Sequence, residues 1–274
     1  MSVGDFATTG EWAAREGWNP GVRDWHAFQA ADPEGFLIGF QRDKPVCCVS
    51  IVRYGADFGF LGFYIAIPEV RGTGCGMAIW RAGMARLAGR NVGLDGVVAQ
   101  QDNYRKSGFR FAYRDVRFSG VAAADETAAR DPMLVEATRV PFDRLAAYDR
   151  RFFPGPRDAF LALWIGLPGF VALAAVEDGA VVGLGVARPC REGYKIGPLY
   201  GDTLAIAERL ARALCHRVAP APVAIDVPEI NPAASKLAQS LGLAPIFETA
   251  RMYTGPDPVV DTAGLYAVTS LELG

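Results

Sequence analysis

The sequence predicts a mixed α/β fold made of two units joined by a linker. Residues 58–76, FGFLGFYIAIPEVRGTGCG, have the pattern of an apolar strand, a glycine-rich turn and the start of a helix. Residues 171–189, VALAAVEDGAVVGLGVARP, have the pattern of two strands joined by an Asp-Gly turn. Between them, residues 121–132 are alanine-rich and polar and end in Asp-Pro, which is typical of a linker. A chain of 274 residues, 51% of them hydrophobic, is long enough to bury a large core and for a second unit.

The first strand, turn and helix predict an anion-binding site. The strand covers residues 58–67 and stops at Pro68. One apolar stripe on the following helix is formed by Met77, Trp80, Met84 and Leu87. Three glycines in the turn, Gly72, Gly74 and Gly76, let the backbone come close to a ligand. Free N–H groups and the positive dipole end at the helix start, with the guanidinium of Arg71, suit a phosphate, so the ligand should be a phosphorylated cofactor.

The glycine spacing separates three kinds of phosphate-binding loop. A nucleotide-hydrolase loop needs Lys and then Ser or Thr after its last glycine, whereas Met77 follows Gly76 here. A dinucleotide loop, G-x-G-x-x-G/A, would need Gly or Ala at Met77 or at Ile79. The pattern that fits is R-x-x-G-x-G at Arg71, Gly74 and Gly76. This pattern resembles the acyl-CoA pyrophosphate loop of the GNAT superfamily of N-acyltransferases, which implies acetyl-CoA (coenzyme A) as the cofactor.

The resemblance extends to the segment after the next strand. Tyr104 stands four residues before the pair Gly108-Phe109, and a GNAT tyrosine at this offset lies close to the thioester sulfur. The resemblance implies that Tyr104 is the general acid for the departing thiolate. It also implies cofactor contacts at Ile65, Ala66, Ile67, Arg71, Gly72, Thr73, Gly74, Cys75, Gly76 and Tyr104. Within this set Cys75 is expected to pack, because a thiolate there would face the pyrophosphate charge.

The second half repeats this pattern without its functional residues. After the hairpin the sequence predicts a helix from about Thr203, a strand at residues 223–227 and a helix with Asn231 as its N-cap. At the position of the glycine-rich loop stands Asp202, whose carboxylate would repel a pyrophosphate. Ala238 stands at the tyrosine position, so the second copy is predicted to be degenerate.

The whole chain resembles the bacterial tandem-GNAT proteins, whose second half is a distinct acetyltransferase-like domain. The resemblance implies an α/β (α+β) fold of two GNAT-like domains, each a mixed, mostly antiparallel twisted sheet flanked by helices. The predicted parts are a catalytic domain at residues 1–120, a linker at 121–132 and a degenerate domain at 133–274. The degenerate domain would shape the substrate pocket or form a chain interface, which is compatible with a homodimer.

The acceptor site is predicted in residues 11–25, EWAAREGWNPGVRDW, because the first two helices of GNAT folds cover the substrate pocket. An aromatic and acidic pocket for a cationic amine would be formed by Glu16, Trp18, Asn19 and Asp24. The alternative is that the tryptophans of this segment only pack the first helix on the sheet, which is favoured for Trp12, and that Glu16 is a solvated residue. Weaker candidates for this pocket are Asp226 and Glu229. Glu69 is a second possible base for the amine, with the alternative that it only caps or fixes the loop around Arg71.

The predicted activity is acetyl-CoA-dependent N-acetyl transfer to an amine of a small molecule, directly within a ternary complex. Tyr104 and Glu16 are the candidate catalytic residues, as acid and base. A rival hypothesis is a non-catalytic acyl-CoA sensor in which the cofactor orders the two halves for a protein partner. The presence of Tyr104 favours the enzyme, because a sensor needs no acid for a thiolate.

Composition and charge argue against other classes of protein. A net charge of −2 argues against broad binding to nucleic acid or to an anionic membrane. The first residues, MSVGDFATTGEW, lack the basic and apolar parts of a secretory signal. The five cysteines form no C-x-x-C pair and only two histidines are present, so no metal site is predicted. A reducing cytoplasm is the expected location.

Overall fold

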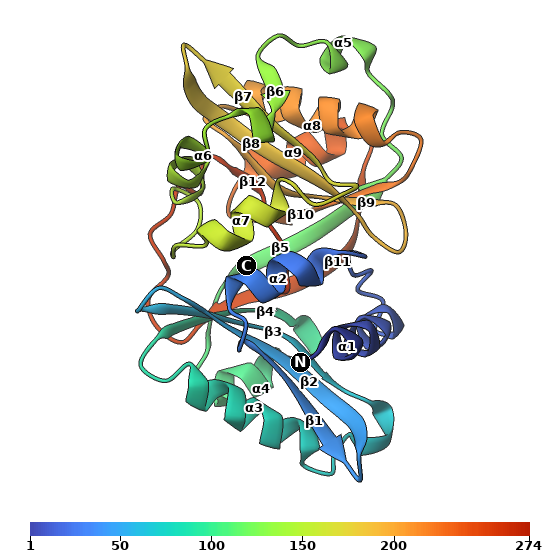
Figure 1. The fold of residues 1–274 in the computed structure, drawn as a ribbon, viewed down its shortest axis with the longest axis vertical. Helices are drawn as coiled ribbons and strands as arrows, with labels where there is room; N and C mark the ends of the chain where they lie inside the picture. The colour runs from blue at the N-terminus through green and yellow to red at the C-terminus, as the bar shows by residue number, and fades with distance from the viewer.

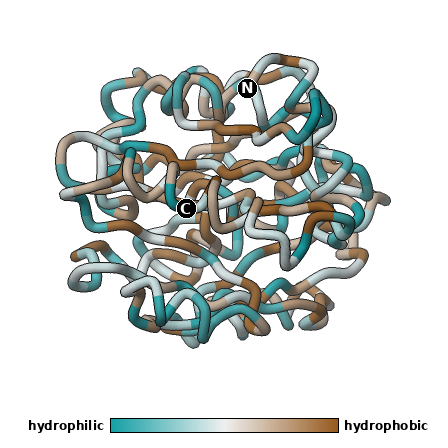
Figure 2. Tube along the Cα trace, turned by 90° about the horizontal axis from the view of Figure 1, so that it is seen from below, coloured by the Kyte–Doolittle hydropathy of each residue, from teal (hydrophilic) through white to brown (hydrophobic). Residues whose placement is uncertain are grey.

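A computed structural model describes residues 1–274, except for the side chain of Ala129. Two lobes lie one above the other and are joined by long central strands (Figure 1). Hydrophobic stretches cross the middle of the molecule and hydrophilic ones gather in the turns at its edge (Figure 2). None of the helices described is both long enough and apolar enough to cross a membrane.

The first half contains the predicted strand, glycine-rich turn and helix. Its elements are α1 (Val3–Arg15), α2 (Asp24–Ala31), β1 (Phe36–Gln41), β2 (Lys44–Tyr54), β3 (Phe58–Ala66), η1 (Pro68–Val70), α3 (Cys75–Arg86), β4 (Asn91–Val97), η2 (Val98–Gln100), α4 (Gln101–Lys106) and β5 (Arg110–Gly120). On α3 the predicted apolar stripe is formed by Trp80 and Leu87, which are buried, and Met84, which is partly buried. Met77 is a correction to that stripe, because it is 48% exposed at the first turn of the helix.

The second half follows the same order of elements after a short helix. Its elements are α5 (Glu126–Ala129), β6 (Leu134–Glu136), η3 (Ala137–Arg139), α6 (Phe142–Asp149), α7 (Asp158–Trp164), β7 (Val171–Glu177), β8 (Ala180–Pro189), β9 (Tyr194–Gly201), α8 (Leu204–Val218), β10 (Val223–Pro228), α9 (Pro232–Ser240), β11 (Ala244–Tyr253) and β12 (Leu265–Ala267). The predicted cap at Asn231 is present, because its side chain accepts a hydrogen bond from the Ala233 N–H. Thr203 caps α8 in the same way, accepting from the Ile206 N–H.

The two halves share one twelve-stranded sheet and exchange a strand. The main path of the sheet is β1-β2-β3-β4-β11-β5-β10-β9-β8-β7-β6. The two halves of the sheet meet where β11 pairs with β5. Each half contains one parallel pair, β3 with β4 in the first and β9 with β10 in the second. β5 of the first half therefore lies beside β10 of the second half, and β11 of the second half lies beside β4 of the first. The predicted boundary at residues 121–132 separates the halves along the chain, but β11 crosses it in space and completes the sheet of the first half.

Two buried ion pairs cross between the halves at matching positions. On β4, Asp95 accepts two hydrogen bonds from Arg251 of β11, at 2.6 and 2.8 Å. On β10, Asp226 accepts two from Arg117 of β5, at 2.6 and 2.9 Å. Each aspartate comes from one half and its arginine from the other, so the paired geometry fixes the register of both exchanged strands.

The two faces of the first half of the sheet are covered differently. Side chains alternate between faces along a strand, so Leu61 packs with Trp80 under α3, whereas Phe60 points to the opposite face. On that opposite face α2 packs against α7 of the second half, where the rings of Phe28 and Trp164 stack at 6.0 Å. The helices near the N-terminus thus lie between the halves (Figure 1).

Candidate active site

A cleft opens where β3 and β4 stop pairing. The two strands pair in parallel from Phe58 with Asn91 to Leu61 with Leu94, and both then continue beyond the last pair. The backbone groups on the facing edges of the strands are therefore free of each other. The cleft at this point has a volume of about 650 Å³. Its lining includes residues from both faces of the sheet, among them Tyr104 from the α3 side and Trp18 from the α1 side.

The glycine-rich turn lies at one end of this cleft. Gly72 and Gly74 have φ values of 79° and 93°, which L side chains rarely adopt, and a Cβ at either position would face open space. Gly74 is the N-cap of the twelve-residue helix α3. The N–H groups of its first turn have no preceding turn to bond, so they can donate to an anion together with the positive end of the helix dipole.

Arg71 joins this turn to the end of α1. Its Nε donates to the Ala66 carbonyl oxygen at 2.9 Å, and its guanidinium pairs with the carboxylate of Glu16. The two side chains are 51% and 34% exposed. An exposed pair of this kind contributes only about 0–1 kcal/mol, so a phosphate could replace the carboxylate at little cost.

Tyr104 lies against the cleft in a tight apolar setting. It is 9% exposed and its ring stacks on Trp80 with centroids 5.7 Å apart. Gly96 makes room for it, because a Cβ there would lie 2.2 Å from the tyrosine ring. Burial raises the pKa of Tyr104 to about 12, and the nearby hydroxyl of Tyr64 adds to the shift. The hydroxyl therefore keeps its proton at neutral pH.

Other residues predicted to contact the cofactor lie in or next to the cleft. Ile65 and Ala66 line it with the glycines of the turn. Thr73 is beside it, and its hydroxyl donates to the Val70 carbonyl oxygen at 2.8 Å. Ile67 and Cys75 pack against the apolar cluster under α3 and are not among the lining residues.

Of the four residues predicted to bind the acceptor, two line the cleft and two do not. Glu16 and Trp18 line the cleft. Asn19 does not, because its amide bonds the backbone of Glu192 in both directions, at 2.8 and 3.0 Å. Asp24 lies outside this cleft but lines a second cavity, beside α1 and α2. It pairs with Arg188 at 3.0 Å, and its pKa is raised by burial against the opposing effect of that arginine.

The weaker candidates of the sequence also lie elsewhere or have partners. Glu69 and Glu229 are exposed, and neither lines the cleft. Asp226 is engaged by Arg117, and its pKa is lowered because this pairing outweighs the effect of burial. Trp12 is 8% exposed within an apolar cluster, as the packing alternative predicts.

The far wall of the cleft was missed by sequence reasoning. It is formed by Arg117, Phe247, Thr249, Leu271 and Glu272. Four of these stand near the end of the chain or on the exchanged strand β11, so only the three-dimensional arrangement brings them to a cleft of the first half. Sequence signals were present only for the ion pairs, since VGLDGV and VAIDVP place Asp95 and Asp226 at the same point of two similar strands.

In the second half the corresponding gap is filled by protein. The parallel pairing of β9 and β10 ends at Ile196 with Ile225. Beyond it β12 pairs with β9, with Leu265 opposite Tyr200. At the corresponding loop Asp202 accepts hydrogen bonds from Tyr148 at 2.9 Å and from Arg151 at 2.8 Å. This half therefore presents a carboxylate and a strand where the first half presents an anion-binding turn and a cleft.

Comparisons with known proteins identify related enzymes. A family model described as an acetyltransferase (GNAT) domain matches residues 145–267. A protein of Pseudoalteromonas sp. (strain SANK 73390), named holothin acyltransferase, is 33% identical over 274 residues and covers 100% of this chain and 92% of that protein. An uncharacterized protein of Caenorhabditis elegans is 30% identical over 161 residues, which is 54% of this chain and 51% of that protein.

Solved structures show the same fold. A putative acetyltransferase from Pyrococcus horikoshii has a TM-score of 0.79 at 22% identity, covering 91% of this chain and 84% of that one. A tandem GNAT protein from the clavulanic acid biosynthesis pathway has a TM-score of 0.59 at 15% identity, covering 94% of this chain and 98% of that one. At these identities the likeness concerns the fold alone.

Proposed function

Because this chain belongs to the GNAT acyltransferases, we propose that the cleft between β3 and β4 binds acetyl-CoA and that the acetyl group passes directly to the amine of a small molecule. The observation that carries the proposal is the gap between two parallel strands, with an anion-binding turn at one end and a buried tyrosine against it. The full-length acyltransferase relative favours this enzyme over the acyl-CoA sensor.

The residues of the first half fit a nucleotide thioester. The turn at Gly72 and Gly74 offers backbone donors and open space to a pyrophosphate. The free edge of β3 beyond Leu61 offers further donors and acceptors to an extended amide chain, as an added strand would use them. Acetyl-CoA would supply the thioester and its thiolate leaving group, and Tyr104 holds the proton that the thiolate needs.

The acceptor is proposed to approach from the face of the sheet that carries α1 and α2. A second cavity there has a volume of about 350 Å³ and shares Phe63 with the cleft. Its aromatic lining is completed by Phe6, Trp25, Phe28 and Phe36. Such a cavity suits the apolar part of a small molecule. The name of the Pseudoalteromonas relative of this chain indicates that holothin is acylated by that protein, so holothin is the first acceptor to test.

The location is proposed from the chemistry of the cysteines. All five are free in the structure. Burial raises the pKa of Cys48, and it raises the pKa of Cys215 to about 11, so both thiols are held protonated in the core. Free thiols persist in a reducing compartment, and we place the protein in the cytoplasm.

Cofactor binding is tested by thermal unfolding of the full chain with and without CoA. A ligand at 100 times its Kd adds about 2.7 kcal/mol to the free energy of unfolding, so Tm should rise. Arg71→Glu should abolish the rise because it places a negative charge beside the phosphate site, whereas Arg81→Glu, an exposed change on α3, should keep it. An unchanged Tm of the wild type at millimolar CoA would contradict the proposal.

Acyl transfer is tested in the same preparation. Acetyl-CoA is mixed with holothin and with a panel of primary amines that includes 2-phenylethylamine, tyramine and histamine, and free thiol is followed with time. Thiol release that depends on the amine supports the transfer. CoA binding without release in any mixture would leave the cofactor assignment standing and remove the proposed acceptor class.

A further inference from the structure

Three carboxylates line the cleft, and they differ in what they contact. Glu16 pairs with Arg71, and Asp95 accepts two hydrogen bonds from Arg251. Glu272 is 6% exposed, yet its Oε2 has no hydrogen-bond partner among the described residues. A buried carboxylate oxygen left without a donor is costly, so a group that is not part of the chain is expected to meet it.

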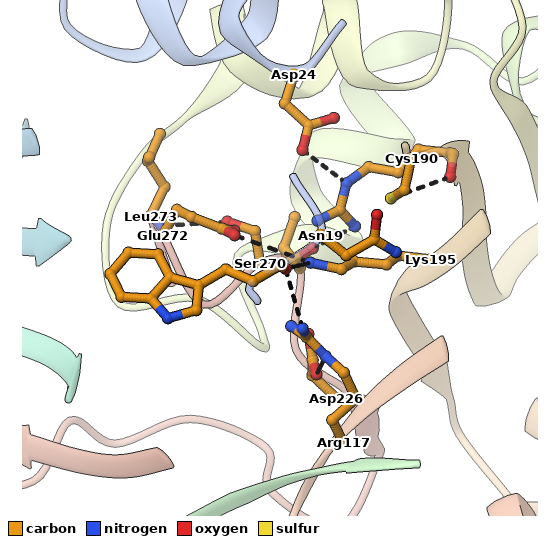
Figure 3. A network of polar contacts seen from close by, with 12 residues as sticks. Asn19, Asp24, Arg117, Cys190, Lys195, Asp226, Ser270, Glu272 and Leu273 are labelled. Carbon is orange, nitrogen blue, oxygen red and sulfur yellow. Dashed lines mark hydrogen bonds and ion pairs between the residues drawn. The ribbon is translucent and has the colours of Figure 1, made fainter. Parts of the chain in front are cut away.

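The other oxygen of Glu272 faces a buried network of charges (Figure 3). Its Oε1 lies 3.9 Å from Nζ of Lys195, which donates to the Trp18 carbonyl oxygen at 3.0 Å. Burial lowers the pKa of Lys195, and the charge of Arg117 adds to this. The other titratable or charged groups around the network are Asp24, Arg117, Arg188, Cys190 and Asp226.

These neighbours do not occupy the free oxygen. Arg117 is engaged by Asp226, and Arg188 by Asp24. Lys195 is oriented toward the Trp18 carbonyl oxygen: its Nζ lies 3.0 Å from that oxygen and 3.9 Å from Oε1 of Glu272. The network therefore balances the charge of Glu272, a residue that lines the cleft, and leaves its buried Oε2 without a hydrogen-bond donor.

The backbone of Glu272 is fixed beside the end of the β3–β4 pairing. Its carbonyl oxygen accepts from the Ser50 hydroxyl at 3.2 Å. A Cβ at Gly62 would lie 2.1 Å from that oxygen, so only glycine fits there. Gly62 follows Leu61, the last residue of β3 that pairs with β4. Glu272 thus stands next to the first free backbone group of β3, on the face of the sheet opposite to Tyr104.

We propose that Glu272 is the general base that takes a proton from the acceptor amine, a role that rests on the function proposed above. The nitrogen electron pair forms the C–N bond of the amide while the C–S bond breaks. One N–H proton passes to Glu272, and Tyr104 gives its proton to sulfur. Amine and thioester thereby become amide and thiol. After the products leave, Glu272 gives its proton to solvent and Tyr104 takes one up from solvent.

This assignment revises the hypothesis for Glu16. A general base must reach the amine with a free oxygen. Glu16 shares its carboxylate with Arg71 at the lip of the cleft, and phosphate binding by that arginine would release Glu16 toward solvent. Glu272 stands deeper, between the two halves, where water is excluded and a proton-accepting oxygen is held in place.

The test is Glu272→Gln, which keeps the shape of the side chain and removes the base. With acetyl-CoA and the amine that reacts fastest in the screen, kcat should fall by about 10² to 10⁴, while the CoA-induced rise in Tm stays as in the wild type. Glu272→Asp keeps a carboxylate and should recover part of kcat. The exposed change Glu248→Gln is the matched control and should leave kcat unaltered.

The results that would overturn the proposal differ in what else they affect. If Glu272→Gln keeps the wild-type kcat, Glu272 is not the base and the proposed function stands. If Glu272→Asp loses as much as Glu272→Gln, or if the loss is in KM alone, the side chain acts by shape or binding. If Glu16→Gln carries the loss of kcat instead, Glu16 is the base. A wild type that acylates no amine removes the proposed function and this role with it.

Discussion

The two halves share one scaffold and differ in what fills the gap between their parallel strands. In the first half β3 and β4 separate beyond Leu61, and a cleft of about 650 Å³ remains. In the second half β9 and β10 separate beyond Ile196, and β12 pairs with the free part of β9. The same break in pairing therefore leaves an open cleft in one half and a closed core in the other.

The C-terminal segment that fills the gap of the second half also forms one wall of the cleft in the first half. After β12 the chain passes Gly197, where a Cβ would lie 2.4 Å from the Val268 carbonyl oxygen, and then Gly62, where a Cβ would lie 2.1 Å from that of Glu272. The two glycines occupy matching places in β9 and β3, one residue after the last parallel pair. The half whose own gap is filled therefore supplies the wall, and one buried carboxylate, of the other half's cleft.

The largest effect is expected at Tyr104, which has alanine as its counterpart in the second half. Tyr104→Phe should lower kcat by about 10² to 10⁴ without a change in CoA affinity, because the ring packing on Trp80 is kept. With a pKa of about 12 the hydroxyl holds its proton at pH 7 and at pH 9, so the ratio of wild-type to variant kcat should be the same at both.

The matched control for this comparison lies in the filled gap. Tyr266, beside Leu265 in β12, is a buried tyrosine whose pKa is also raised by burial. Tyr266→Phe should leave kcat as it is. Equal loss of kcat in the two variants would mean that the chemistry is not confined to the first half.

A somewhat smaller effect, on the free energy of unfolding, is expected when one of the two buried ion pairs between the halves is removed. Arg117→Ala and Arg251→Ala each leave a buried aspartate without its partner, which costs about 3–5 kcal/mol of unfolding free energy. Because the pairs occupy matching places, the two losses should be similar, and urea unfolding followed by fluorescence and circular dichroism should show one transition.

The exposed pair of Arg217 with Glu136, at 2.6 Å, serves as the reference. Arg217→Ala should cost less than about 1 kcal/mol because the two side chains remain solvated. If only one of the two buried variants is destabilised more than this reference, the ion pairs do not play equivalent roles in the two halves.

Local structure and the cofactor turn could be predicted from the sequence, because both depend on residues close together in the chain. The strand predicted at residues 58–67 is β3, and the cap at Asn231 begins α9. The same holds for the position of Tyr104 beside the cleft, which followed from a family resemblance. The function of the turn stays a proposal.

The arrangement of the halves could not be predicted in the same way. An apolar alternation identifies a strand but does not name its neighbours, so nothing in the pattern of residues 244–253 places it beside β4. Asn19 looked like a pocket residue, yet it bonds the loop after β8 and does not line the cleft. Asp24 lines the second cavity instead of the cleft, because it pairs with Arg188 of β8. Glu272 carried no local signal, since its role depends on the path of the last residues between the lobes.

The measurement that tests the central comparison most directly is the number of CoA molecules bound by the full chain. A fragment of the first half is not suitable for this titration, because a chain that ends near residue 120 lacks β11, which completes its sheet. Titration calorimetry of the intact protein should give one site per chain, and Arg71→Glu should remove it. Two sites, or one site that survives Arg71→Glu, would contradict the assignment of an open cleft to the first half and a filled one to the second.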